Sequence, residues 1–156
     1  MSSTLVFGLS GQVGEALLPR LDARLGSILA LSRNPQPARE GIEWQSGVLQ
    51  SFGDAPADCE RILSLGPLDA FAEWLARTQP RAARIVALGS TGLRDKRDSP
   101  DARDRDVAQR LAQAEQILFE FAKQHGVAAT VLRPTLLYGN GRDLSLTPLA
   151  QRARRW

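Results

Sequence analysis

Three residue types that often carry chemistry or cross-links are nearly missing from this 156-residue chain, which has one cysteine, one histidine and one tyrosine. A single cysteine, Cys59, allows no disulfide within the chain and no metal site built from several thiolates, so a reducing compartment suits it. No apolar run approaches the length that spans a membrane, and the N-terminus has neither the basic region nor the long apolar core of a signal peptide. These absences predict a cytoplasmic protein without a membrane partner.

The lone histidine and the balance of charge exclude further classes. His125 precedes Gly126 at the end of a helical pattern, where it suits a cap, and with one distant histidine a hydrolase triad at Ser10 or Ser90 has little support. Twenty basic and seventeen acidic residues leave a net charge of +3, which does not indicate a nucleic-acid-binding surface. Acidic and basic residues alternate over residues 92 to 106, which argues against a metal site.

Short apolar runs alternate with longer helical patterns along the whole chain. We expect strands near residues 4 to 8, 27 to 32, 42 to 45, 60 to 65, 84 to 89 and 128 to 133, and helices near 12 to 25, 68 to 78 and 104 to 125. Residues 34 to 41 and 92 to 106 read as loops, and Pro19 should kink the first helix. This alternation predicts an α/β fold, a Rossmann-type doubly wound parallel sheet with three αβα layers, forming one domain over residues 1–156.

Three glycines stand where the first strand turns into the first helix. Gly8 permits a tight turn, Gly11 lets the backbone approach a pyrophosphate, and Gly14 allows close packing of the helix. The free N–H groups and the positive dipole end of the helix then face the anion. We therefore predict a dinucleotide site in this turn, against the alternative of a structural turn without a ligand. The residues assigned to it are Gly8, Ser10, Gly11, Gln12, Val13 and Gly14.

The carboxyl ends of the other strands supply the remaining candidates. Ser32 and Arg33 close the second strand, where an NAD enzyme carries an acid for the ribose and an NADP enzyme an arginine for the 2′-phosphate. Arg33 therefore predicts NADP, with NAD as the other possibility and a surface arginine as the alternative reading. Gly66 and Pro67 close the fourth strand and leave room for a ribose, although a turn before a helix explains them equally well.

Motifs after the fifth and sixth strands resemble one family. Gly89-Ser90-Thr91, then Leu132-Arg133-Pro134 and Tyr138-Gly139, together with the glycine turn, resemble the extended branch of the short-chain dehydrogenase/reductase family, which includes NAD-dependent epimerases and dehydratases. The resemblance implies that Thr91, or Ser90 beside it, hydrogen-bonds the reacting carbonyl or hydroxyl. It also implies that Arg133 and Pro134 lie in the cofactor-binding segment.

The chain departs from that family at its proton-transfer pair. The family tyrosine and lysine positions fall at Val107 and Leu111, and neither side chain can move a proton. Many relatives also have an aspartate where Val48 stands, and they extend into a C-terminal portion that forms the substrate pocket. The resemblance therefore implies a dinucleotide-binding domain without that portion.

Three hypotheses follow from these residues. The first is an NAD(P)-binding oxidoreductase or epimerase that acts on a carbonyl or nucleotide-sugar substrate. The second is a non-catalytic dinucleotide-binding or interaction module with the same fold, and the loss of tyrosine and lysine favours it. The third is a scaffold that binds no nucleotide. A homodimer through the helices at 68–78 and 104–125 is compatible with each of them.

Overall fold

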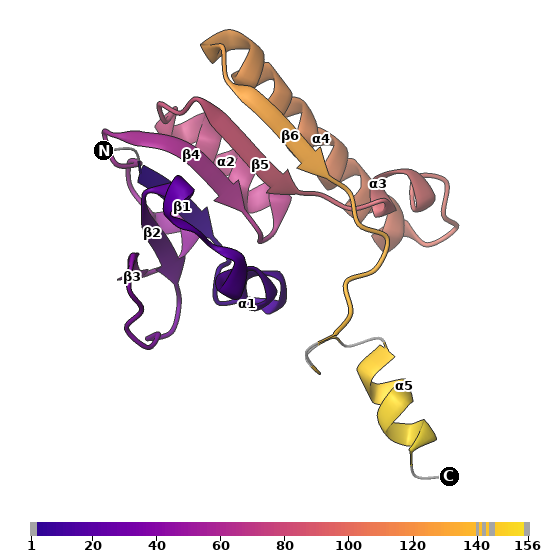
Figure 1. Cartoon of the computed structure of the whole chain (residues 1–156). Coiled ribbons are helices and arrows are strands. Elements are labelled where there is room, and N and C mark those ends of the chain that lie inside the picture. Colours follow the sequence, from indigo (N-terminus) through magenta and orange to yellow (C-terminus); the bar gives the residue numbers. More distant parts are fainter. Residues whose placement is uncertain (1–2, 140, 142, 144–145, 155–156) are drawn as a thin grey trace.

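A six-stranded parallel sheet organises the chain (Figure 1). The computed structural model describes residues 3–139, 141, 143 and 146–154. The strands are β1 (Ser3–Phe7), β2 (Ser27–Ser32), β3 (Ile42–Ser46), β4 (Cys59–Ser64), β5 (Arg84–Leu88) and β6 (Ala128–Leu132). Their order is β3-β2-β1-β4-β5-β6, and each neighbouring pair is parallel. This is the order of a doubly wound sheet, so the Rossmann-type fold expected from the sequence is confirmed.

Helices cover both faces of the sheet. α2 (Leu68–Thr78) and α4 (Ala102–His125) run side by side on one face, and α1 (Gln12–Leu17) lies on the other (Figure 1). The shorter elements are η1 (Leu18–Arg20), η2 (Ala23–Leu25), η3 (Leu49–Ser51), α3 (Gly92–Asp95) and α5 (Leu146–Ala153). Because every neighbouring pair of strands is parallel, the carboxyl ends of all six strands lie along one edge of the sheet.

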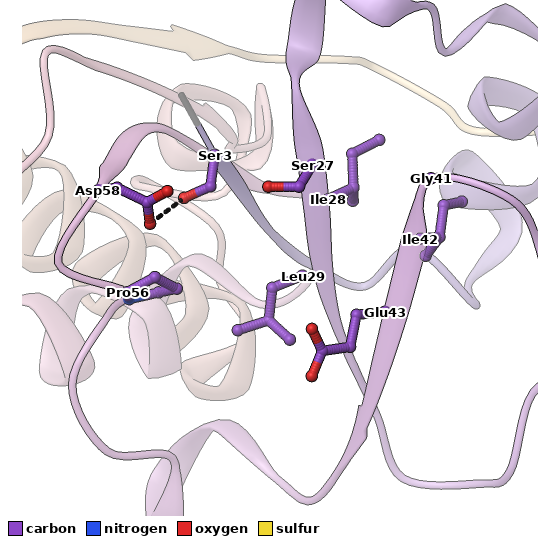
Figure 2. A pocket seen from close by; sticks show the side chains of 9 residues that line it. All are labelled: Ser3, Ser27, Ile28, Leu29, Gly41, Ile42, Glu43, Pro56 and Asp58. Carbon is purple, nitrogen blue, oxygen red and sulfur yellow. Dashed lines mark hydrogen bonds between the residues drawn. The ribbon is translucent and has the colours of Figure 1, made fainter. Parts of the chain in front are cut away.

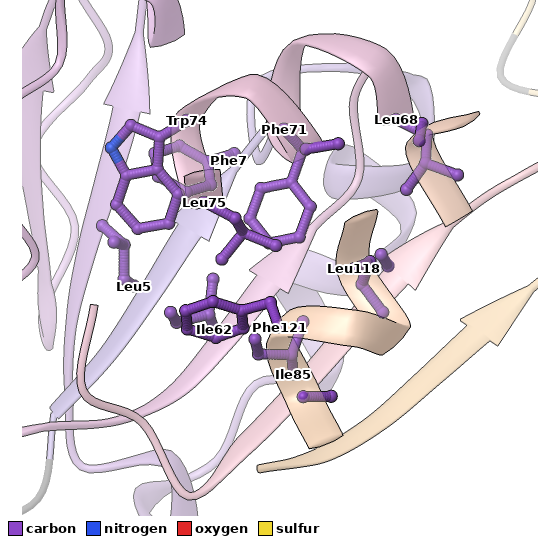
Figure 3. Packing of buried hydrophobic residues seen from close by; sticks show 14 of the residues in the cluster. Leu5, Phe7, Ile62, Leu68, Phe71, Trp74, Leu75, Ile85, Leu118 and Phe121 are labelled. Atoms are coloured by element: carbon purple, nitrogen blue, oxygen red, sulfur yellow. The ribbon is translucent and has the colours of Figure 1, made fainter. Parts of the chain in front are cut away.

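Alternate residues of β1 belong to two separate cores, as the period of a strand requires. Leu5 and Phe7 join the larger core under α2 and α4, where the Phe7 ring lies 4.9 Å from the Trp74 ring, centroid to centroid (Figure 3). Val6 belongs to the smaller core on the α1 side. The apolar stripes of α2 and α4 are therefore buried within the domain.

The helix predicted over residues 12 to 25 is wrong beyond Leu17. The chain passes into η1, which contains Pro19, and then runs extended at Leu21. Pro19 has no N–H to donate to the carbonyl four residues earlier, so the α-helical ladder stops there. Leu21 and Leu25 still pack into the smaller core. The spacing of these leucines therefore predicted their burial correctly but predicted an α-helix where none forms.

The loop predicted over residues 92 to 106 contains α3 and the first turn of α4. Asp101 caps α4 by accepting a hydrogen bond from the Arg103 N–H at 2.8 Å. The Arg105 guanidinium donates to the carbonyls of Ser99 and Pro100 at 2.7 and 2.9 Å. Local polar hydrogen bonds replace apolar packing in this segment, so its helical turns leave no apolar periodicity in the sequence.

Two properties of the whole described chain bear on function. None of its helices combines the length and apolarity needed to cross a membrane. Within the same residues, no three His, Cys, Asp or Glu side chains gather as metal ligands do.

Candidate functional site

The switch point of the sheet lies between β1 and β4, where the chain connections leave in opposite directions. Gly8 ends β1 with φ +82°, and a Cβ atom there would lie 2.9 Å from the Leu65 carbonyl carbon and 3.0 Å from the Gly66 nitrogen. Only glycine fits this conformation next to that backbone. The turns after β1 and β4 therefore meet at the carboxyl edge of the sheet, where doubly wound folds have their ligand crevice.

The other two glycines shape the start of α1. A Cβ on Gly14 would lie 2.1 Å from the Leu9 carbonyl oxygen, so glycine lets α1 pack directly on the turn that precedes it. Gly11 is the N-cap of α1, and no side chain caps the helix there. The Gly11 N–H donates to the Gly8 carbonyl at 3.0 Å, and no side chain caps the N–H groups in the first turn of α1, a position that suits an anion.

Ser10 and Ser32 join the glycine turn to the end of β2. Their hydroxyl groups are 3.2 Å apart, and Ser32, which is buried, also donates to the Asn34 carbonyl at 2.8 Å. The structure thus brings together two predicted site residues that lie 22 positions apart. Arg33 follows immediately, and its side chain is exposed at the same edge.

The ends of β4, β5 and β6 complete the same edge. Gly66 faces open space, and Pro67 is the N-cap of α2. The Thr91 N–H donates to the Pro134 carbonyl at 3.3 Å, which joins the turns after β5 and β6. The Ser90 hydroxyl accepts a hydrogen bond from the Gly92 N–H at 3.1 Å. The two predicted catalytic residues therefore lie where the fifth and sixth strands open toward the crevice.

Arg133 has a second role that the sequence did not reveal. Its Nε and Nη2 atoms donate to the two Glu115 carboxylate oxygens at 2.7 and 2.5 Å, and this pairing raises the pKa of Arg133. Glu115 is buried on α4. The Arg133 guanidinium thus holds the end of β6 against α4, and its contact with a cofactor stays a prediction.

The positions of the family's proton-transfer pair are apolar in space as well as in sequence. Leu111 packs against the larger core, and Val107 is half-buried one turn earlier. Tyr138, the only tyrosine, is 69% exposed on the segment after β6. Lys96, which the sequence did not single out, is bonded to the start of α4, because its Nζ donates to Asp104 Oδ1 at 2.7 Å.

A hollow of about 400 Å³ lies at the opposite end of the sheet (Figure 2). Its lining includes Ser3 and Ser27, the first residues of β1 and β2, and the Ser3 hydroxyl donates to Asp58 at 3.0 Å. None of the predicted site residues lines it. In doubly wound sheets the ligand binds at the carboxyl ends, so this hollow does not compete with the crevice.

No protein-family model matches the chain, and no curated protein matches it by sequence. Solved structures match it in three dimensions. MoeE5 in complex with UDP-glucose and NAD gives a TM-score of 0.68 at 17% identity, covering 96% of this chain and 60% of MoeE5. A mutated uronate dehydrogenase gives 0.62 at 17% identity, covering 85% of this chain and 58% of the dehydrogenase. UDP-N-acetylglucosamine 4-epimerase from Bacillus cereus gives 0.56 at 12% identity, covering 89% and 55%.

The chain shares their Rossmann-type fold. The resemblance to NAD-dependent epimerases and reductases expected from the sequence is thereby confirmed in the fold. The chain spans about three fifths of the length of MoeE5.

Proposed function

We propose that the chain binds a nicotinamide dinucleotide in the crevice between β1 and β4, with the pyrophosphate against the main chain of the Gly8–Gly14 turn. One observation carries this proposal. The backbone of Gly8 lies directly against that of Leu65 and Gly66, next to the start of α1, which no side chain caps. The backbone N–H groups in the first turn of α1, which no side chain caps, suit an anion, and the small residues leave room for it. Ser10, Gln12 and Val13 lie in the same turn, and MoeE5, which has the same fold, was solved with NAD.

The preferred dinucleotide in this proposal is NADP. Arg33 is exposed directly after β2, beside the buried Ser32 that is bonded to the glycine turn. A guanidinium at this place pairs with a 2′-phosphate through two parallel hydrogen bonds.

The reaction in this proposal is an oxidoreduction or epimerisation of a carbonyl or nucleotide-sugar substrate. Thr91 and Ser90 hold the reacting oxygen by hydrogen bonds, because both follow β5 at the carboxyl edge of the sheet. A bound nicotinamide supplies or accepts hydride there. MoeE5 was solved with UDP-glucose and with UDP-glucuronic acid, which supports the nucleotide-sugar class.

A second candidate is a non-catalytic dinucleotide-binding module of the same fold. The apolar Val107 and Leu111 favour it, because neither supplies a proton where the related family carries tyrosine and lysine. In either case the chain is proposed to act in the cytoplasm, with pairing of two copies through the outer faces of α2 and α4. Light scattering across a concentration series tests the pairing.

Calorimetric titration with NADPH and with NADH tests the binding proposal. Saturable binding of NADPH, tighter than that of NADH, is expected. Thr91→Ala should keep this affinity. It should lower the rate of NADPH oxidation with a reactive dicarbonyl, 9,10-phenanthrenequinone, and the rate of NADP⁺ reduction with UDP-glucuronic acid. If the wild-type chain binds a dinucleotide but turns over neither substrate, the non-catalytic binding module is the correct function. Absence of binding to either dinucleotide contradicts both candidates.

A further inference from the structure

The stem of Lys96 and the Ser90 hydroxyl both approach the same point next to Gly92. A Cβ atom placed on Gly92 would lie 3.2 Å from Ser90 Oγ, 3.5 Å from Lys96 Cδ and 3.8 Å from Lys96 Cε. Both side chains therefore lie within 4 Å of one point, and the buried Gly92 puts no atom there. The lysine stem thus reaches the place after β5 where Ser90 and Thr91 are proposed to hold a substrate oxygen.

Asp104 fixes the end of that stem on α4. Its Oδ1 accepts from Lys96 Nζ at 2.7 Å, and its Oδ2 accepts from the Ser99 hydroxyl at 3.2 Å. Asp104 precedes Val107 by three residues, and Leu111 follows Val107 by four, so the three positions share one helix face. Asp104, which binds the ammonium group, therefore lies about one turn from the position where the related family has its tyrosine.

The pair is also open enough to exchange protons with water. The Lys96 side chain is 44% exposed and that of Asp104 is 37% exposed. An ammonium group has three N–H donors on a rotatable stem, and Asp104 Oδ1 accepts from one of them. Lys96 can thus keep its partner and still present a donor to a second oxygen.

We propose that Lys96, held by Asp104 beside Ser90, is the proton donor of this site and takes over the task that tyrosine performs in the related family. This inference rests on the proposed oxidoreductase function. It distinguishes that function from the non-catalytic module, because it supplies the acidic group that Val107 and Leu111 lack.

The step balances for a carbonyl substrate and a reduced nicotinamide. The hydride brings an electron pair to the carbonyl carbon, and the C=O π pair moves to the oxygen. That oxygen takes a proton from Lys96 Nζ, and the electron pair of the broken N–H bond stays on the nitrogen. Water then returns a proton to the neutral amine. In the oxidative direction the neutral amine accepts the hydroxyl proton.

A purely structural ion pair that closes the turn between α3 and α4 is the competing explanation, and substitution by arginine separates the two. Lys96→Arg keeps a cation for Asp104 but cannot release a proton near neutral pH. Lys96→Met removes both properties, and Lys123→Met is the matched control, because Lys123 is exposed near the far end of α4. Folding of each variant is checked by its thermal unfolding midpoint.

The measurements are NADPH oxidation with 9,10-phenanthrenequinone, NADP⁺ reduction with UDP-glucuronic acid, and the calorimetric affinity for NADPH. We expect both Lys96 variants to lose about 10²- to 10⁴-fold in rate, as loss of general acid catalysis does, with the NADPH affinity and the Lys123→Met rate unchanged. A Lys96→Arg variant that retains the wild-type rate overturns the inference, as does an unchanged rate in Lys96→Met. If the wild-type chain binds no NADPH, the proposed function fails and the inference with it.

The two lysines allow a readout that needs no turnover. With lysine labelled by ¹³C at Cε, the spectrum holds one Cε signal from Lys96 and one from Lys123. Addition of NADP⁺ with 9,10-phenanthrenequinone, a pair that cannot react, should move the Lys96 signal and leave that of Lys123 in place. If both signals stay in place while calorimetry shows NADP⁺ bound, Lys96 is not at the reacting oxygen and the inference is wrong.

Discussion

Arg133, the first residue after β6, donates two hydrogen bonds to Glu115 in the middle of α4, at 2.7 and 2.5 Å. The Glu115 side chain is only 9% exposed, whereas that of Arg133 is 36% exposed. A buried carboxylate is costly without its partner, so this pair fixes how the end of β6 meets the helix that carries Asp104, Val107 and Leu111.

Replacing one member of this pair should destabilise the domain more than replacing both. Arg133→Met leaves the Glu115 carboxylate buried and unpaired, and we expect a loss of about 1–3 kcal/mol in the free energy of unfolding. The double variant Arg133→Met/Glu115→Leu removes the unpaired charge and should recover most of that loss. Urea unfolding measures the free energy of unfolding of both variants. If the double variant loses as much stability as Arg133→Met, the two side chains are not coupled.

Ser64 offers a substitution that should not destabilise the domain. Its hydroxyl is fully buried at the end of β4 and has no hydrogen-bond partner among the described residues. Ser64→Ala removes an unsatisfied polar group, so the free energy of unfolding should rise by roughly 1 kcal/mol. Ser32→Ala is the matched control, because the Ser32 hydroxyl bonds to Ser10 and Asn34, and it should cost about 1 kcal/mol. A clear loss in Ser64→Ala would mean that its hydroxyl has a partner.

Arg33 should set the preference between the two dinucleotides. Arg33→Asp removes the proposed partner of the 2′-phosphate, and a charge-assisted contact of about 1.5–3 kcal/mol corresponds to a loss of roughly 10- to 100-fold in NADPH affinity. NADH has no such phosphate, so its affinity should change little. Calorimetry with both dinucleotides measures the difference, and equal losses would show that Arg33 does not contact the phosphate.

Acid should release the start of α5. The Asp143 carboxylate accepts hydrogen bonds from the Thr147 hydroxyl and from the N–H groups of Thr147, Leu146 and Gly139, and these bonds hold its pKa well below the usual range. Because the pKa is lowered in the folded state, the stabilisation is complete above the ordinary aspartate value of about 3.9 and is lost as the pH falls through the depressed value.

Amide NMR shifts of Leu146 and Thr147 follow this change directly. They should stay constant from pH 7 through the ordinary aspartate pKa and move only as the pH falls through the depressed pKa of Asp143. Asp143→Ala should show displaced shifts already at pH 7. Shifts in the wild-type chain that already move in step with the ordinary aspartate pKa of about 3.9 would contradict the capping role.

Much of the fold could be predicted because burial leaves a simple signature in sequence. The runs at β2 and β5 are nearly continuous in apolar residues, as strands between two helical layers must be, and Gly126 ends α4 as its position indicates. The first helix failed because Leu17, Leu21 and Leu25 repeat at a helical spacing while Pro19 stops the ladder between them. Apolar periodicity shows that a face is buried, but the missing N–H group of Pro19 ends the α-helix that this spacing predicts.

The candidate site was predictable only where the backbone defines it. The glycine turn and the strand ends follow from topology, so Gly8, Ser10, Ser32 and Gly66 lie along one edge of the sheet as expected. Lys96 and Asp104 were not singled out, because residues 95 to 106 alternate in charge and offer many equally plausible pairs. Arg133 lies in one of the family motifs, but its pairing with Glu115 depends on how β6 meets α4.

A crystal structure of the chain with bound NADPH tests the central claim most directly. The account predicts the diphosphate within hydrogen-bond distance of the main-chain N–H groups between Ser10 and Val13, with the adenosine end toward Ser32 and Arg33. A dinucleotide bound elsewhere, such as in the hollow lined by Ser3 and Ser27, or a crevice that stays closed at saturating NADPH, would contradict it.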